Sequence, residues 1–185
     1  VYQKFLIKNK HYPLRQITIA DKSKVTPPPK IAAEIKAQDE TIADILDEWK
    51  PAKLLHDQFI VPVQGAFSSP FGQRRILNKV KKARHTGLDI AAKKGTPVKA
   101  AAAGTVVATG HFIITGNTVF INHGQGLTSA YAHLSKINVE PDQKVKQGQI
   151  IGQVGSTGRS TGAHLHWAVS LNGVAVNPLL FVDQV

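Results

Sequence analysis

The hydrophobic pattern of the first 58 residues predicts short strands followed by one helix. The apolar triplets FLI and ITI, both within residues 4–20, are typical of short strands left from a small β module. Three consecutive prolines at residues 27–29 form a stiff arm, which cannot lie inside a helix but can precede one. Isoleucine and leucine then recur with near-helical spacing, which predicts an amphipathic helix over residues 30–48, ending before Pro51.

From Phe59 onward the pattern changes to many short strands. Glycine becomes frequent, and short valine-rich runs are separated by turn residues, which is typical of a compact antiparallel β domain. Residues 95–110 and 142–155 share one order of features: a polar turn, a Val-Lys pair, glycine and an apolar strand. We interpret this as a weak internal repeat of two hairpin-like halves folded against each other, a duplicated hybrid motif. The predicted fold is mainly β, with a domain over residues 59–185 preceded by a segment, residues 1–58, that holds the β remnant, the proline arm and the helix.

The amino-acid composition limits the kinds of site and partner that the protein can have. A chain of 185 residues can bury a core without staples, and the absence of cysteine excludes disulfides, a thiol nucleophile and thiolate-bound zinc. The formal net charge of +11 favours anionic partners, which include nucleic acid, anionic lipid and acidic cell-wall polymers. No apolar run is long enough to span a bilayer. Because the chain contains no methionine, we expect Val1 to follow a removed segment, such as a signal peptide or a membrane anchor.

The stretch GAHLHWAV at residues 162–169 places two histidines one residue apart. On a strand, His164 and His166 would share one face while Leu165 and Trp167 fill the other. One imidazole could then bind a metal while its neighbour moves protons. A pair of ordinary surface or core histidines is the alternative for this motif alone.

Two further stretches carry candidate side chains. In HTGLD, His85 precedes Asp89 by four residues, and the apolar LDIAA predicts a strand that enters the core. A buried carboxylate there needs a partner, which could also be a neighbouring lysine or a turn. In AYAHLSKI, strand alternation predicts that Tyr131 and His133 point the same way, although His133 could be an ordinary half-exposed residue. We assign no role to the remaining histidines, His11, His56, His111 and His123.

Together these residues contain the parts of a metal-assisted amide hydrolase. Two imidazoles and one carboxylate with an open fourth position are typical of a catalytic zinc site, which His85, Asp89 and one of the 164/166 pair could form. Zinc lowers the pKa of a water molecule that can attack a carbonyl. The remaining histidines could accept its proton or stabilise the tetrahedral oxyanion.

The same stretches resemble a known family. HTGLD, YAHL and HLHW are similar, in order, to the three signatures of the LytM/lysostaphin-type zinc metallopeptidases, and the flanks SSPFGQR, GTPVKAAAAGTVV and GSTGRSTGA agree. The resemblance covers residues 59–182 and implies a small, mostly antiparallel β domain that holds zinc in a groove and cuts peptide bonds of bacterial peptidoglycan. It implies zinc ligation by His85, Asp89 and His166, a catalytic base at His164, and a second active-site histidine at His133 that orients groups or stabilises the oxyanion.

One feature departs from the family pattern. Some members carry a tyrosine a few residues before the first zinc histidine, and residues 78–85, NKVKKARH, contain none. Another group must supply that hydrogen bond, or the transition state is stabilised differently. We assign Tyr131 to substrate binding. The basic run at residues 74–85 is either a solvated loop or a contact for anionic wall polymer.

The N-terminal part resembles the β module, proline arm and helix that precede this domain in periplasmic members from Gram-negative bacteria. We therefore predict a Zn²⁺-dependent endopeptidase acting on peptidoglycan peptide stems at the D-alanyl–diaminopimelate cross-link rather than at a glycine bridge. We expect a monomer in the periplasm, secreted or otherwise in the cell envelope. The arm and helix could lie across the groove and limit access for a large substrate.

Two other classes remain as alternatives. A non-catalytic wall-binding or amidase-activating module shares the fold, but relatives of that class have lost ligands, and this sequence retains them all. A nucleic-acid partner is not expected, because the charge permits it but aromatic residues are sparse and no nucleic-acid motif is recognised.

Overall fold

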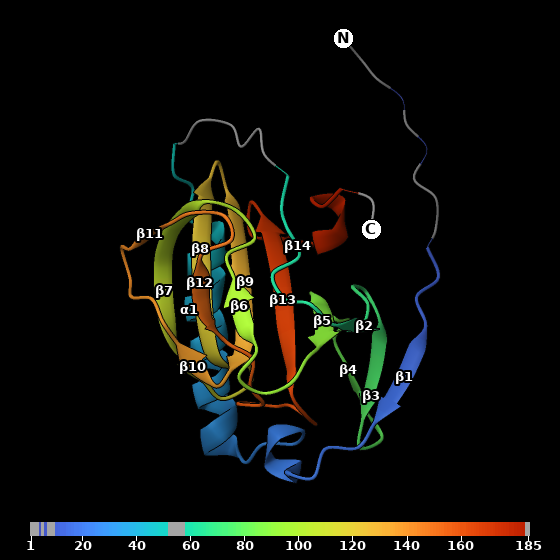
Figure 1. The fold of residues 1–185 in the computed structure, drawn as a ribbon. Helices are drawn as coiled ribbons and strands as arrows, with labels where there is room; N and C mark the ends of the chain where they lie inside the picture. Colours follow the sequence, from blue (N-terminus) through green and yellow to red (C-terminus); the bar gives the residue numbers. More distant parts are fainter. Residues whose placement is uncertain (1–3, 5, 7–9, 52–57, 184–185) are drawn as a thin grey trace.

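A computed structural model describes residues 4, 6, 10–51 and 58–183 of the chain (Figure 1). Its centre is an eight-stranded sheet whose strand pairs are all antiparallel. Its strands follow the order β11 (Lys144–Val145), β7 (Gly104–Phe112), β8 (Gly116–Gly124), β9 (Leu127–Leu134), β13 (His164–Leu171), β5 (Leu88–Ala91) and β2 (Ala66–Ser69), with β14 (Val174–Val176) paired to β13. The last helix or strand in the described part of the chain is a short 3-10 helix, η2 (Pro178–Leu180). The mainly β, antiparallel fold predicted from the sequence is confirmed.

A second, three-stranded sheet packs on one face of the large sheet. It consists of β10 (Lys136–Ile137), β12 (Ile150–Gln153) and β6 (Pro97–Lys99). The hydrophobic core fills the space between the two sheets, with Val98 and Ile151 of the small sheet against Leu165 and Trp167 of the large one. This packing uses every second residue of β13, so the alternate residues of that strand face the other side of the sheet.

The strands of each repeat segment pair with strands of the other segment. Residues 95–110 supply β6 and β7, and residues 142–155 supply β11 and β12. Each segment completes the other, because β6 pairs with β12 while β11 pairs with β7. Their connecting turns are joined in the same reciprocal way, since the Ala100 amide donates to the Gln149 carbonyl over 2.8 Å and the Gly148 amide donates to the Ala100 carbonyl over 2.9 Å. The internal repeat therefore reflects two hairpin-like halves folded against each other.

The N-terminal segment lies beside and over this core. Strand β1 (Leu14–Ile17) runs parallel to β3 (Arg74–Leu77), which pairs with β4 (Val80–Lys82). A 3-10 turn, η1 (Lys22–Lys24), leads into α1 (Pro29–Asp47), within one residue of the predicted helix. The strand that we expected at ITI, residues 17–19, lies three residues earlier, because its pairing with β3 sets its bounds. Ile19 lies beyond this strand and packs against Val25 and Leu77. Most of FLI falls outside the described residues.

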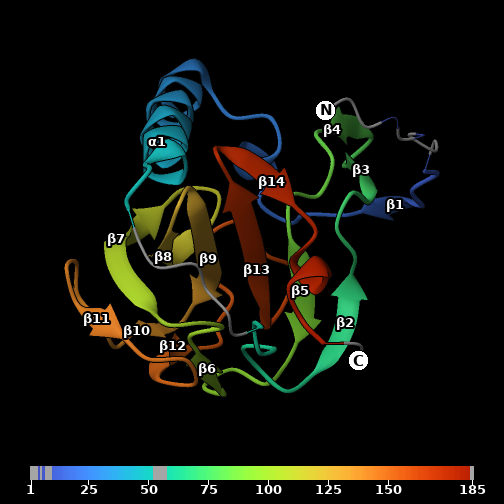
Figure 2. The same ribbon diagram turned by 90° about the horizontal axis from the view of Figure 1, so that it is seen from above.

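Helix α1 covers the face of the large sheet opposite the small sheet (Figure 2). Its side chains are at most half-buried, and polar contacts hold it: the Ile113 amide donates to Gln38 Oε1 over 2.8 Å, and Asn122 Nδ2 donates to the Glu48 carbonyl over 3.0 Å. No helix in the described part of the chain combines the length and apolar character needed to cross a bilayer. The division at residues 58/59 stays a prediction.

Candidate metal centre and active site

Three predicted ligands converge on one point. His166 on β13 lies directly opposite Asp89 on β5, because these two residues are Cα partners in the sheet. His85, on the loop before β5, reaches the same place. Asp89 Oδ1 is 2.9 Å from His85 Nε2 and 2.8 Å from His166 Nδ1, and the two nitrogens are 3.0 Å apart. Two imidazole nitrogens and one carboxylate oxygen at these separations form a group that could hold a metal ion.

The surroundings of these atoms fit a metal centre. Zinc takes nitrogen and oxygen ligands at roughly 2.0–2.2 Å and keeps one position open in catalytic sites, which agrees with three donor atoms about 3 Å apart. The Nδ1–H of His85 donates to the Pro70 carbonyl over 2.9 Å, which leaves Nε2 for the metal. Arg75 Nη2 donates to Asp89 Oδ2 over 2.6 Å, so Oδ1 remains on the side of the histidines.

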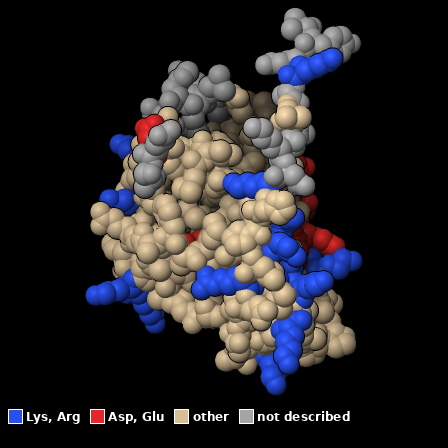
Figure 3. All heavy atoms as spheres, turned by 90° about the vertical axis from the view of Figure 1, so that its right-hand side faces the viewer, with Lys and Arg blue, Asp and Glu red and all other residues tan. Residues whose placement is uncertain are grey.

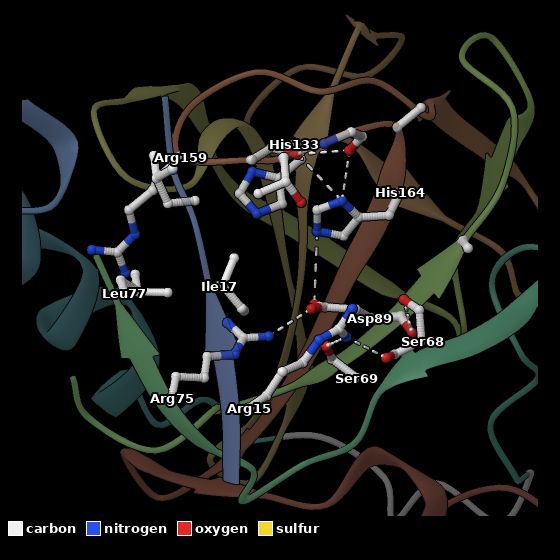
Figure 4. A pocket seen from close by; sticks show the side chains of 16 residues that line it. Arg15, Ile17, Ser68, Ser69, Arg75, Leu77, Asp89, His133, Arg159 and His164 are labelled. Carbon is white, nitrogen blue, oxygen red and sulfur yellow. Dashed lines mark hydrogen bonds and ion pairs between the residues drawn. The ribbon is translucent and has the colours of Figure 1, made fainter. Parts of the chain in front are cut away.

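Two further histidines border this group. The ring centres of His133 and His164 lie 4.8 Å apart, and His164 Nε2 is 3.9 Å from Asp89 Oδ1 (Figure 4). A backbone carbonyl fixes each ring, since His133 Nδ1 contacts the Thr157 carbonyl and His164 Nδ1 the Gly162 carbonyl, both over 2.8 Å. A carbonyl only accepts hydrogen bonds, so Nδ1 carries the proton in the neutral rings and Nε2 is free to accept one. Both rings therefore present an acceptor nitrogen beside the candidate metal position.

Strand alternation correctly predicts that His164 and His166 point to the same face of the sheet, but its prediction that Tyr131 and His133 share a face is wrong. His164 and His166 share the open face of the sheet while Leu165 and Trp167 are fully buried in the core, as expected. His133 reaches that open face only because its backbone is left-handed, with φ of 62°, which breaks the alternation of β9.

The expected position of Tyr131 was wrong. Tyr131 pairs with Trp167 on the core side, has no exposed surface, and its hydroxyl accepts a hydrogen bond from the Ala101 amide over 2.7 Å. Its side chain therefore cannot contact substrate, and we withdraw the substrate-binding assignment.

Comparison with known proteins places this geometry in a family. Residues 83–178, more than half of the chain, match peptidase family M23. The chain belongs to peptidase family M23. The DD-carboxypeptidase/endopeptidase Mpg of Neisseria meningitidis is 47% identical over 114 residues, covering 60% of this chain and 26% of Mpg. The peptidoglycan DD-endopeptidase ShyC of Vibrio cholerae is 36% identical over 159 residues, covering 80% of this chain and 36% of ShyC. This M23 chain thus spans about a quarter to a third of these two curated relatives.

Solved structures support the same assignment. A structure described as an M23 peptidase from Pseudomonas aeruginosa superimposes with a TM-score of 0.74 at 40% identity, covering 83% of this chain and 63% of that one. A zinc-containing peptidase from Vibrio cholerae gives a TM-score of 0.62 at 33% identity, covering 66% of this chain and 39% of that one. The M23 fold therefore includes the sheet that carries the candidate ligands.

The electrostatics of this M23 site suit metal binding. Burial alone would raise the pKa of Asp89, but hydrogen bonds from His166 and His85 outweigh it and keep the pKa well below its ordinary value. Burial lowers the pKa of His166, against an opposing effect of Asp89. Burial also lowers the pKa of His133 to about 3, and the charges of His166 and His164 add to the shift. An ionised carboxylate and neutral imidazoles are the forms that bind a metal or accept a proton.

Two cavities open at the M23 site. One, of about 230 Å³, is lined by β1, β2 and the loop before β13, and the other, of about 540 Å³, lies between α1 and the β3–β4 hairpin. Four residues line both of them: Arg75, Leu77, His133 and Arg159. A third, apolar cavity of about 270 Å³ separates Ile42 and Leu46 of α1 from small residues of the sheet and reaches His166. The N-terminal segment thus forms walls of every one of these cavities.

Sequence reasoning missed Arg75 and Arg159. Arg75 lies in the basic run that we interpreted as a solvated loop or polymer contact, yet it is half-buried on a strand and pairs with Asp89. The alternation in RRIL offered a signal, since it puts Arg75 on the same side as the buried Leu77 and Arg74 on the other. Arg159 sits in a glycine- and serine-rich loop, where no local pattern predicts the direction of a side chain.

Proposed function

We propose that this M23 domain is a zinc-dependent endopeptidase that hydrolyses peptide cross-links of bacterial peptidoglycan, at the D-alanyl–diaminopimelate bond. One observation carries the proposal: three donor atoms within about 3 Å of one another lie beside two histidines whose Nε2 atoms are available as acceptors. The similarity to the DD-carboxypeptidase/endopeptidase Mpg and to the peptidoglycan DD-endopeptidase ShyC supports the choice of substrate.

In this proposal His85, Asp89 and His166 hold the ion. Zn²⁺ supplies Lewis-acid polarisation of the scissile carbonyl and lowers the pKa of water. Arg75 holds the second oxygen of Asp89, and the Pro70 carbonyl holds the far side of His85, so both ligands keep their orientation in the absence of substrate. Such fixed ligands reduce the rearrangement required when the reaction begins.

His164 moves the proton in the proposed mechanism. Its Nε2 accepts a proton from the attacking water, and the Gly162 carbonyl on Nδ1–H stabilises the imidazolium that results. The same nitrogen then gives the proton to the leaving amine. This assigns His164 as general base and then general acid, the role that the family resemblance implies.

His133 orients the reactants. Because its Nδ1–H is bound to the Thr157 carbonyl and its pKa is lowered to about 3, the ring is neutral at pH 7 and its Nε2 accepts hydrogen bonds. It therefore favours aligning the attacking water over donating to an oxyanion. Of the two roles that the resemblance implies for His133, this environment supports the orienting one.

Metal analysis combined with digestion of purified sacculi tests the proposed function. We expect zinc near one per chain and release of cleaved cross-links that a chelator abolishes. Intact sacculi with zinc bound would instead favour the non-catalytic wall-binding or amidase-activating module. Salt-sensitive DNA binding without zinc would favour a nucleic-acid binder.

The proposed substrate indicates the compartment of the protein, and the composition of the site indicates its oligomeric state. Peptidoglycan lies outside the cytoplasm, so we place the protein in the periplasm, among secreted proteins or elsewhere in the cell envelope. We propose that the chain acts as a monomer, because the described ligands and both histidines come from a single chain.

A further inference from the structure

Two arginines from distant parts of the chain line the same cavities beside the candidate metal ligands. Arg75 comes from β3, and Arg159 from the loop between β12 and β13. Both line the two cavities that open at the site, and Figure 4 shows them on the same side of the pocket, near Leu77. Because the two cavities share these side chains, a ligand bound in either cavity has both arginines and His133 in its walls.

The walls around this pair are strongly cationic. Arg15, the sheet neighbour of Arg75, lines the first cavity, and Lys82 and Arg84 line the second. The carboxylates among the described lining residues are Asp89, already held by the ligand cluster and Arg75, and Asp39 of α1. Most of the charged side chains visible on this side of the molecule are Lys or Arg (Figure 3). A divalent ion at the ligands would add further positive charge.

The two guanidinium groups repel each other. Burial and the positive charge of Arg75 both lower the pKa of Arg159, and only Asp39 acts in the opposite direction. Asp89 pairs with Arg75 over 2.6 Å, and a further anion placed between the two guanidinium groups would be attracted by both of them. Arginine presents a planar fork of N–H donors that matches the two oxygens of a carboxylate.

We propose that Arg75 and Arg159 form a subsite for the free carboxylate on the amine side of the scissile bond. This inference rests on the proposed function. In a DD bond, the D-residue that supplies the amide nitrogen carries a carboxylate on the carbon bonded to that nitrogen. The carboxylate is present both in the D-alanyl–diaminopimelate cross-link and at a D-alanyl-D-alanine terminus, whereas an internal glycine bridge has none. The arginine pair thereby selects DD bonds and positions the leaving amine.

Two synthetic peptides test the subsite on the full 185-residue chain. They are identical except that the carbon beside the scissile nitrogen carries a carboxylate in one and a carboxamide in the other. We measure kcat/KM for both, and the affinity of the His164→Ala variant for each uncleaved peptide. We expect the carboxylate peptide to be preferred roughly 10- to 100-fold in both measurements, because hydrogen bonds between charged groups are stronger than neutral ones.

Substitutions test whether the arginine pair causes the preference for the carboxylate peptide. Arg159→Gln should reduce the carboxylate-to-carboxamide ratio to near one, and Arg159→Lys should keep part of it, since lysine retains the charge without the fork. Arg74→Gln is the matched control, because Arg74 is exposed on the opposite side of the same strand and its loss removes the same charge. Arg74→Gln should leave the ratio unchanged.

The outcomes separate this inference from the proposed function. If the wild-type chain cleaves both peptides equally well, or if Arg159→Gln lowers both by the same factor, the subsite is overturned while the peptidase stands. The wild-type comparison needs no substitution, so it decides the matter even if Arg159→Gln fails to fold. If the zinc-loaded chain neither binds nor cleaves either peptide and leaves sacculi intact, the proposed function fails, and the subsite fails with it.

Discussion

Gly87 lies so close to His166 that a Cβ atom at position 87 would sit 2.7 Å from Cε1 and 2.9 Å from Nε2 of its ring. The same atom would be 2.6 Å from the Trp167 carbonyl oxygen, so the backbone of β13 closes the other side. Nδ1 of His166 points away from Gly87 toward Asp89. The missing side chain at position 87 therefore lets the ring take the orientation in which its nitrogen meets the other ligand atoms.

Gly87→Ala should weaken metal binding. The added methyl group must displace the ring or the strand, and disturbance of a ligand's supporting contacts costs about 10- to 100-fold in metal affinity. Competition with a chromogenic chelator measures the change. Gly162→Ala is the control, because a Cβ there meets nothing within 4 Å, and it should retain wild-type affinity. Equal zinc affinity of Gly87→Ala and wild type would contradict the assignment of His166 as a ligand.

The two histidines of HLHW should separate by metal content. His166→Ala and Asp89→Ala each remove a donor atom and should lose zinc. His164→Ala should keep zinc and lose roughly 10²–10⁴ in turnover, the usual contribution of general acid–base assistance. Elemental analysis of each purified variant and assay on a short peptide check both halves of the prediction. Release of the metal by His164→Ala would show that the roles within the pair are reversed.

A buried histidine outside the site should make stability depend on pH. His123 contacts the Ala103 carbonyl through Nδ1 and the Ser129 hydroxyl through Nε2, each over 2.7 Å, and burial lowers its pKa to about 4. The unfolded chain binds this proton near pH 6.5, so His123 contributes stability above that pH and loses it as pH falls toward 4. A difference of this size corresponds to about 3 kcal/mol.

Denaturant unfolding between pH 7.5 and 4 measures that loss. His123→Gln removes the titrating group, so the variant should be less stable at neutral pH yet show a shallower decline on acidification. His111→Gln is the comparison, because His111 is exposed. An unchanged slope in His123→Gln would rule out His123 as the source of the pH dependence.

Removal of residues 1–56 should raise activity on large substrates. Arg15 and Ile17 of β1 wall one cavity, and Ile42 and Leu46 of α1 wall another, so this segment narrows the approach to His133 and His166. We expect turnover of sacculi to rise at least several-fold and turnover of a short peptide to change less. Dye release from labelled sacculi and a peptide assay make the comparison. If neither rate changes, the segment acts only as a spacer.

Local pattern accounts for much of the fold and of the candidate site. Strand alternation placed His164 and His166 on one face, and isoleucine spacing located α1 to within a residue at each end. It failed at Tyr131, because the left-handed backbone of His133 shifts the alternation, and a positive φ at a histidine has no sequence signature. It also missed Arg159, whose position depends on tertiary packing of a loop. The arrangement of β1 beside β3 likewise required a contact between segments about 60 residues apart.

The reciprocal exchange of β6, β7, β11 and β12 links the order of synthesis to folding. When residues 95–112 leave the ribosome, the partners of β6 and of the outer edge of β7 have not yet been made. Those edges stay open for the time needed to add roughly 40 further residues, about 2–8 s at the usual elongation rates. Nascent chains that stall in this interval would expose unpaired valine-rich strands to neighbouring chains. The strand pairing that closes the core of the finished domain therefore leaves two strand edges unpaired in its half-made form.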